Sequence, residues 1–208
     1  MARAVQERTN RRTLIARALY HCISNQGYAN TSLKDIADRA GMSPSHVGYY
    51  FDDRAAILEY YALGLCERIV GGFPDLGEPD TSTLADAIAS YCFGEGQLNS
   101  AFLGVLQELS GLAVHDPRLR EIKTEHATAW RKYLEAFFGR AKPADGLSPR
   151  KAAWLMHAIL VGFDTNTLFD SSLDREAAHG LFRGSLRALA GLEPNGIGGP
   201  ADAREPAR

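Results

Sequence analysis

The segment between positions 31 and 54 carries side chains suited to contact with a nucleic acid. Serine hydroxyls and the imidazole of His46 can bond to base edges, His46 to guanine N7 or O6. Phenol, ammonium and guanidinium groups suit phosphate oxygens. The candidate DNA contacts are Thr31, Ser32, Lys34, Ser43, Pro44, Ser45, His46, Tyr49, Tyr50 and Arg54.

Two short helices separated by a glycine turn are expected to position these residues. The first is predicted over Leu33–Ala40, with Ser32 and Asp35 forming a capping box and Gly41 ending the helix. This helix, the turn and the helix that follows form a helix-turn-helix pattern.

The second helix is predicted to begin at Pro44, with Ser43 as its N-cap, and to run to about Phe51. Met42, Val47 and Phe51 have the spacing to pack inward. In such a pair the second helix enters the major groove and its first residues meet base edges.

The rest of the chain is also predicted to be helical, so the fold class is all-α, with periodicity near 3.6 residues and turn signals between segments. We expect a helix-turn-helix DNA-binding domain over residues 1–54, a larger helical domain for effector binding and dimerisation over 55–190, and a disordered tail over 191–208. The other helices are expected at Glu7–Gln26, from Asp52 or Asp53 to Val70, and at Ser82–Gln97, Ser100–Val114, Pro117–Arg140, Pro149–Phe169 and Asp174–Ala190.

Charge and cysteine content favour a DNA-binding protein of the cytoplasm. Residues 1–54 carry a net charge of +3 and the remainder −5, so a polyanionic partner is expected for the first part only. The segment before Glu7, which contains Arg3, is interpreted as a basic arm that reaches along the DNA backbone or into the minor groove. Three cysteines without a CxxC motif indicate reduced thiols, and no secretory signal or membrane span is predicted.

The N-terminal residues resemble the tetracycline-repressor (TetR) family of bacterial transcription regulators. The matching pieces, within residues 9–60, are "RRTLIARALYHCISNQGY", "TSLKDIADRAGMS" and "YYFDDRAAIL". Gly48 departs from the family pattern, which often has a phosphate-binding tyrosine there, so Tyr49 is expected to take over that contact. Arg54 stands where the family usually has lysine. "HDPRLREI" and "LVGFDTNTLFD" are similar to the betaine-regulator type of C-terminal domain.

The resemblance implies a homodimer that binds a palindromic operator, most simply as a repressor that a small-molecule effector releases. It places the dimer interface on the last two helices, where small residues recur every fourth position in the final helix and permit close approach. A fully buried helix in a monomer is the alternative reading of the apolar segment Pro149–Phe169. The expected interface residues are Ala158, Gly162, Gly180, Leu181, Gly184 and Ala188.

An effector pocket in the larger domain would be mostly apolar with a few polar groups. Each candidate could equally be a core residue, and His157 and Asn166 are the stronger candidates because a buried polar group needs a partner. The candidates are Tyr91, Phe102, His126, Trp130, Tyr133, His157, Phe163 and Asn166.

Two other classes of protein are alternatives to an effector-responsive repressor. A small helical enzyme is not expected, because HExxH, GxSxG, P-loop and GxGxxG motifs are absent from the sequence. A metal- or thiol-responsive regulator on the same scaffold is the alternative, although the scattered His and Cys residues match no ligand motif. No cofactor, metal or membrane partner is predicted.

Overall fold

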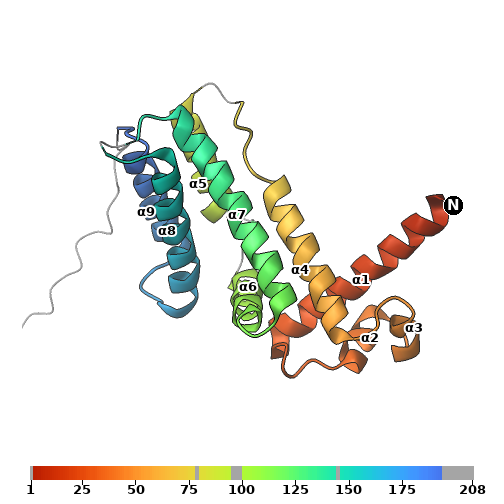
Figure 1. Cartoon of the computed structure of the whole chain (residues 1–208). Coiled ribbons are helices and arrows are strands. Elements are labelled where there is room, and N and C mark those ends of the chain that lie inside the picture. The colour runs from red at the N-terminus through yellow and green to blue at the C-terminus, as the bar shows by residue number, and fades with distance from the viewer. Residues whose placement is uncertain (1, 78–79, 95–99, 144–145, 194–208) are drawn as a thin grey trace, which may run out of the picture. The chain divides into compact units, whose positions relative to one another are not determined.

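The computed structural model describes residues 2–77, 80–94, 100–143 and 146–193, and within these ranges the regular structure is helical (Figure 1). The predicted tail falls mostly on residues 194–208, outside the described residues. No helix in the described ranges is long and apolar enough to cross a membrane. The helices are α1 (Ala2–Gln26), α2 (Leu33–Ala40), α3 (Pro44–Gly48), α4 (Arg54–Gly71), α5 (Thr81–Phe93), α6 (Ser100–Ala113), α7 (Pro117–Arg140), α8 (Pro149–Phe169) and α9 (Arg175–Leu189).

Contacts divide the chain into two compact units. The first comprises Met1–Gly71 and Gly104–Glu125, and the second comprises Gly72–Leu103 and His126–Arg208. The first unit extends past the boundary predicted at residue 54, because α4 packs against α1 and a carboxylate of α6 bonds to the turn after α1. In the second unit, α9 packs against α5 and α8.

Local capping signals set the limits of α2 as predicted. Ser32 accepts the backbone N–H of Asp35 at 3.1 Å, and the Asp35 carboxylate accepts the N–H of Ser32 at 2.7 Å. Gly41 ends the helix in the left-handed conformation, with φ of 67°, which favours glycine. The capping box and the glycine stop are therefore confirmed.

Three predicted helix limits differ from the structure. The helix predicted over Ser82–Gln97 ends at Phe93, with Gly94 as its C-cap, and the predicted end at Gln97 lies outside the described residues. α1 begins at Ala2 rather than Glu7, so the segment before Glu7, with Arg3, belongs to this helix and does not form a separate arm. α3 ends at Gly48 instead of Phe51, and turns connect it to α4. Asp53 then accepts the backbone N–H of Ala56 at 2.8 Å, which makes it the capping residue of α4.

An arginine pair joins α9 to α5 in the second unit. Arg183 forms two bonds of 2.7 Å to the Asp86 carboxylate, and the buried Arg187 donates to Asp86 at 3.2 Å and to Ser82 at 2.8 Å. The hydrogen bond from Arg183 is the main reason that the pKa of Asp86 lies below its ordinary value.

Candidate nucleic-acid interface

The predicted recognition helix α3 is held by a buried anchor and exposes its opposite face. Val47 is fully buried, and Met42 and Phe51 are buried beside it, as the spacing predicts. Ser45 and His46 are exposed. A helix as short as α3 depends on this anchor, because short isolated helices are only marginally stable in water.

Two serines fix the first turn of α3. The Ser43 hydroxyl accepts the backbone N–H of His46 at 3.2 Å and lies 3.0 Å from the hydroxyl of Ser45. Pro44 occupies the first helical turn, as predicted. The result is a rigid, exposed helix start that presents a hydroxyl and an imidazole.

An aromatic group continues this exposed face. Tyr49 is 72% exposed, and its ring meets that of Tyr50 edge-on at 5.1 Å. The half-buried Tyr50 also lies 5.6 Å from the ring of His46. Tyr49 is therefore accessible to a phosphate, while Tyr50 supports both neighbouring rings.

The predicted contacts at the start of α2 include exposed and buried residues. Lys34 and Ser32 are exposed, although the Ser32 hydroxyl also bonds to Asp35 at 2.6 Å. Thr31 is only 1% exposed, and its hydroxyl donates to the carbonyl of Gly27 at 2.8 Å. Thr31 is therefore not available for a DNA contact, because its hydroxyl is buried and bonded inside the turn.

Arg54 is the second predicted contact that the structure places differently. Its guanidinium donates to the carbonyls of Tyr28, at 2.8 Å, and of Thr31, and its Cζ lies 4.1 Å from the centre of the Tyr28 ring. The Tyr28 backbone N–H in turn donates to Glu108 of α6 at 2.5 Å. Arg54 thus fixes the turn between α1 and α2, a role that its spacing in the sequence did not indicate.

A second basic residue has a similar structural role. The Arg12 guanidinium lies over the rings of Phe51, at 4.6 Å, and Tyr60, at 4.5 Å. Since Phe51 belongs to the anchor of α3, this cation–π contact connects α1 to the recognition helix.

Among the predicted effector residues, three aromatic side chains come together in the second unit. Tyr91 of α5 and Trp130 and Tyr133 of α7 surround Phe73, whose ring lies 4.3 Å from Trp130 and 4.6 Å from Tyr133. The Tyr133 hydroxyl donates to the carbonyl of Pro74 at 2.9 Å. Burial raises the pKa values of Tyr91 and Tyr133, so both phenols stay neutral.

Sequence reasoning missed Phe73 because a loop residue has no helical periodicity. The available signal was the Gly71–Gly72 pair before it. A Cβ atom on Gly72 would lie 2.8 Å from the Tyr91 hydroxyl, so glycine permits the close approach of this loop.

The remaining predicted effector residues do not share this aromatic cluster. Phe163 meets Phe93 edge-on at 6.1 Å. Asn166 is exposed, and its amide donates to the carbonyl of Gly162 in its own helix at 2.9 Å, so the expectation of a buried polar group there is wrong. Phe102, His126 and His157 are half-buried.

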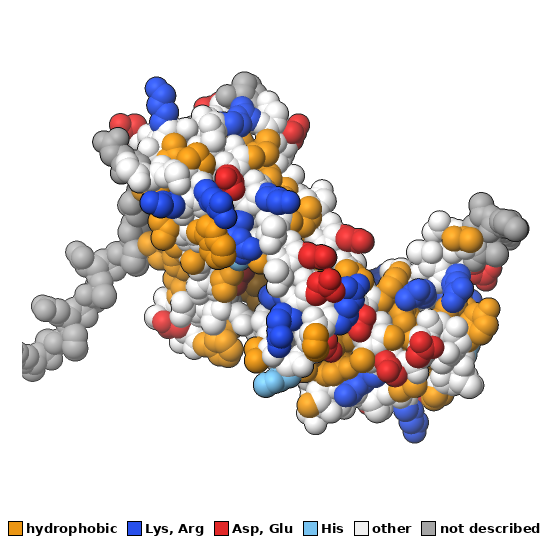
Figure 2. Space-filling model, in the orientation of Figure 1, with side chains coloured by type: hydrophobic (Ala, Val, Ile, Leu, Met, Phe, Trp, Pro, Cys, Tyr) orange, Lys and Arg blue, Asp and Glu red, His pale blue; other side chains and the backbone are white. Residues whose placement is uncertain are grey.

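The predicted dimer residues lie on α8 and α9, beside exposed apolar side chains. Trp154, Leu155 and Val161 are 54%, 48% and 49% exposed, and Figure 2 shows hydrophobic side chains gathered over α8. Ala158, Gly180, Leu181 and Ala188 are exposed, and Gly162 and Gly184 are half-buried.

An exposed recognition helix on a buried anchor, preceded by a capped helix and a glycine turn, defines a helix-turn-helix DNA-binding protein. The family model for bacterial regulatory proteins of the tetR family matches residues 15–61, and that for the C-terminal part of BetI-type transcriptional repressors matches residues 82–191. The chain belongs to the tetR family of transcriptional regulators and carries a BetI-type C-terminal region. The family's members are regulators, not enzymes.

Relatives and solved structures agree with this assignment. The HTH-type transcriptional regulator BetI of Yersinia pestis (strain Pestoides F) is 27% identical over 139 residues, which are 65% of this chain and 70% of the relative. BetI of Stenotrophomonas maltophilia (strain R551-3) is 25% identical over 86% of this chain and 95% of the relative.

Solved structures share the fold at lower identity. A TetR transcription regulator from Haloarcula marismortui has a TM-score of 0.76 at 20% identity, covering 88% of this chain and 97% of that one. A regulator from Saccharomonospora viridis, solved in complex with choline, has a TM-score of 0.73 at 15% identity, covering 84% and 94%.

Proposed function

We propose that this regulator is a homodimeric repressor that binds a palindromic operator in the cytoplasm and releases it when a small molecule binds. Residues 1–54 would bind DNA, and residues 55–190 would bind the effector and dimerise. The observation that carries the proposal is the exposure of Ser45, His46 and Tyr49 on a recognition helix held by Val47. Phosphate contacts would come from Tyr49, Tyr50 and Lys34.

Dimerisation would double a contact surface that is small in one chain. A recognition helix as short as α3 reaches few base pairs, whereas two helices related by a two-fold axis reach half-sites about 34 Å apart. The exposed apolar side chains of α8 support this interface, since association would remove them from water.

The test is operator binding measured by fluorescence anisotropy on the DNA upstream of the gene. His46→Ala should reduce discrimination at one base pair of each half-site by about 1–3 kcal/mol. His115→Ala is the matched control, because His115 is exposed in the turn after α6. Absence of a sequence-specific complex for the wild-type protein would refute the proposal.

We infer that the effector is an organic cation bound by Tyr91, Trp130 and Tyr133, in the space that the Phe73 ring fills in this structure. Ring faces attract quaternary ammonium groups, and the choline complex of the Saccharomonospora viridis regulator supports this class of ligand. Because the Phe73 ring lies only 4.3 Å from Trp130, it must move to admit a cation between the rings.

Tryptophan fluorescence tests this inference, since the chain has two tryptophans. In a Trp154→Phe background, added choline should change the emission of Trp130 and saturate. Phe73→Ala should bind choline more tightly because the occupying ring is removed, while Phe169→Ala, an exposed phenylalanine, is the control. No saturable change in either protein would refute the cation site but would leave operator binding intact.

The structure gives little support to a thiol-responsive regulator. Burial raises the pKa of the Cys66 thiol to about 11 and raises that of the buried Cys92. The thiolate is the reactive form, so both groups are poor nucleophiles at neutral pH.

A further inference from the structure

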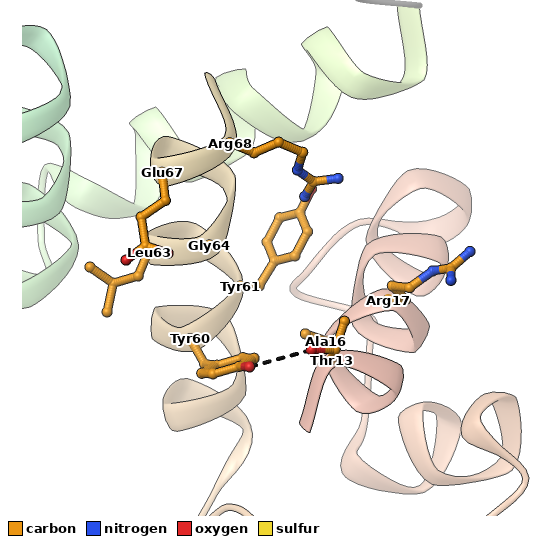
Figure 3. A pocket seen from close by; sticks show the side chains of 9 residues that line it. All are labelled: Thr13, Ala16, Arg17, Tyr60, Tyr61, Leu63, Gly64, Glu67 and Arg68. Atoms are coloured by element: carbon orange, nitrogen blue, oxygen red, sulfur yellow. Dashed lines mark hydrogen bonds between the residues drawn. The ribbon is translucent and has the colours of Figure 1, made fainter. Parts of the chain in front are cut away.

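A cavity of about 430 Å³ lies between α1 and α4, within the first unit. Its lining residues belong neither to α3 nor to the aromatic cluster. Its volume falls in the range of about 300–1,000 Å³ that is typical of small-molecule sites. The lining residues, shown in Figure 3, are Thr13, Ala16, Arg17, Tyr60, Tyr61, Leu63, Gly64, Glu67 and Arg68.

The cavity has an apolar wall made by both helices. Ala16 and Tyr61 are buried, and the Tyr61 ring stacks on Tyr20 at 6.0 Å, which holds it in place. A Cβ atom on Gly64 would meet no atom within 4 Å, so the absence of a side chain there leaves room for a ligand. Such a wall suits a planar or aliphatic hydrocarbon body.

The polar groups of the cavity are mostly cationic or neutral. Arg17 and Arg68 line it from opposite helices, and neither forms an ion pair within the described residues. Arg68 extends from α4 beside the Tyr61 ring (Figure 3). Glu67 contributes one negative charge, so the lining carries a net charge of +1.

A hydroxyl pair closes one part of the lining. The Thr13 and Tyr60 hydroxyls lie 3.4 Å apart, a long contact for two oxygen atoms (Figure 3). The Thr13 hydroxyl already donates to the carbonyl of Thr9 at 3.0 Å, so the Tyr60 hydroxyl is the one that can turn to a ligand oxygen at little cost.

We propose that this cavity binds a small organic monoanion whose carboxylate meets Arg68 and whose apolar body lies against Ala16, Gly64 and Tyr61. Guanidinium groups match the planar geometry of a carboxylate, and the single net charge favours a monoanion over a neutral or cationic ligand. The site is distinct from the cation site inferred above, in both charge and position in the sequence.

Calorimetric titration of the full-length protein with 4-phenylbutyrate tests the proposal without DNA or effector. The acid should bind saturably at one site per chain, and the isosteric amide, 4-phenylbutyramide, should bind more weakly by up to about fivefold, since an exposed charge pair contributes up to about 1 kcal/mol. Arg68→Gln should weaken binding of the acid by a similar factor and remove the preference over the amide.

Gly64→Leu provides the steric test, because its side chain would occupy the cavity. It should abolish binding, while the matched control Gly111→Leu, on the exposed surface of α6 and also without atoms near its Cβ, should bind as the wild type does. Both substitutions place leucine in a helix, where it is favoured over glycine, and circular dichroism would verify folding. No saturable binding to the wild type, or equal binding to Gly64→Leu, would overturn the proposal.

Discussion

Replacing Arg54 by alanine distinguishes a phosphate contact from a structural role. In the structure the guanidinium donates to the carbonyls of Tyr28 and Thr31 and stacks on the Tyr28 ring. Arg54→Ala would remove both hydrogen bonds and the ring contact. The carbonyls of Tyr28 and Thr31 would then need water as their hydrogen-bond donor. The turn between α1 and α2 would lose its hydrogen bonds to Arg54 of α4.

The structure sets the expected size of the loss. A hydrogen bond from a charged donor contributes about 1.5–3 kcal/mol, and a cation–π contact at an exposed site about 0.5–1 kcal/mol. Since Arg54 is only half-buried, water compensates part of this sum. We expect Arg54→Ala to lower the free energy of unfolding by about 2–4 kcal/mol.

Two measurements on the same variants distinguish a structural role of Arg54 from a phosphate contact. Urea denaturation reports stability, and the salt dependence of operator binding reports phosphate contacts. Lys34→Ala, at an exposed position of α2, should leave stability within about 0.5 kcal/mol of the wild type and lower the salt slope by about 1. If Arg54→Ala instead behaved like Lys34→Ala, with unchanged stability and a lower slope, the structural role would be refuted.

Three further substitutions test the dimer interface, the glycine of α3 and the bond between α5 and α9. Val161→Asp should give monomers in light scattering and weaken operator binding on the order of 100-fold through loss of bivalency, whereas Val114→Asp, at a 61% exposed valine, should do neither. Gly48→Ala should raise the free energy of unfolding by up to about 0.5–1 kcal/mol, because its Cβ meets no atom within 4 Å; a destabilised variant in urea would contradict this. Asp86→Asn should cost about 1–2 kcal/mol at pH 7, because the buried Arg187 loses its carboxylate. The pKa of Asp86 is lower in the folded state than its unfolded value of 3.8, so its ionised carboxylate stabilises the fold above that value. This stabilisation is lost as the pH falls through the folded pKa. The difference in unfolding free energy between wild type and Asp86→Asn should therefore be smaller near pH 3 than at pH 7.

The helix limits that could be predicted from the sequence are those set by capping residues within a few positions of the helix end. Ser32, Gly41 and Ser43 act through backbone groups a few positions away, so their types and spacing suffice. The buried position of Val47 follows in the same way from its spacing. These features account for the correct prediction of the recognition helix and its exposed serines.

The features that could not be predicted join residues distant in the sequence. A basic residue at position 54 can meet either phosphate or a carbonyl, and only the fold shows that Tyr28 and Thr31 present theirs. Thr31 likewise has the type of a phosphate ligand but is buried by its turn. The apolar character of α8 predicts that Asn166 is buried, but its side chain is exposed in the single chain.

The peptide at Tyr28 joins three elements of the first unit. Its N–H donates to Glu108 of α6, its carbonyl accepts from Arg54 of α4, and Gly27 before it has φ of 77°, which favours glycine. The turn therefore holds α2 in a position that depends on α6 and α4 together. A hydrogen bond to a charged group contributes about 1.5–3 kcal/mol, which lies within the coupling free energy of about 1–3 kcal/mol typical of allosteric proteins. In the proposed repressor, displacement of the Glu108 carboxylate alone would therefore involve enough free energy to alter operator affinity, even with α4 in its place beside α1.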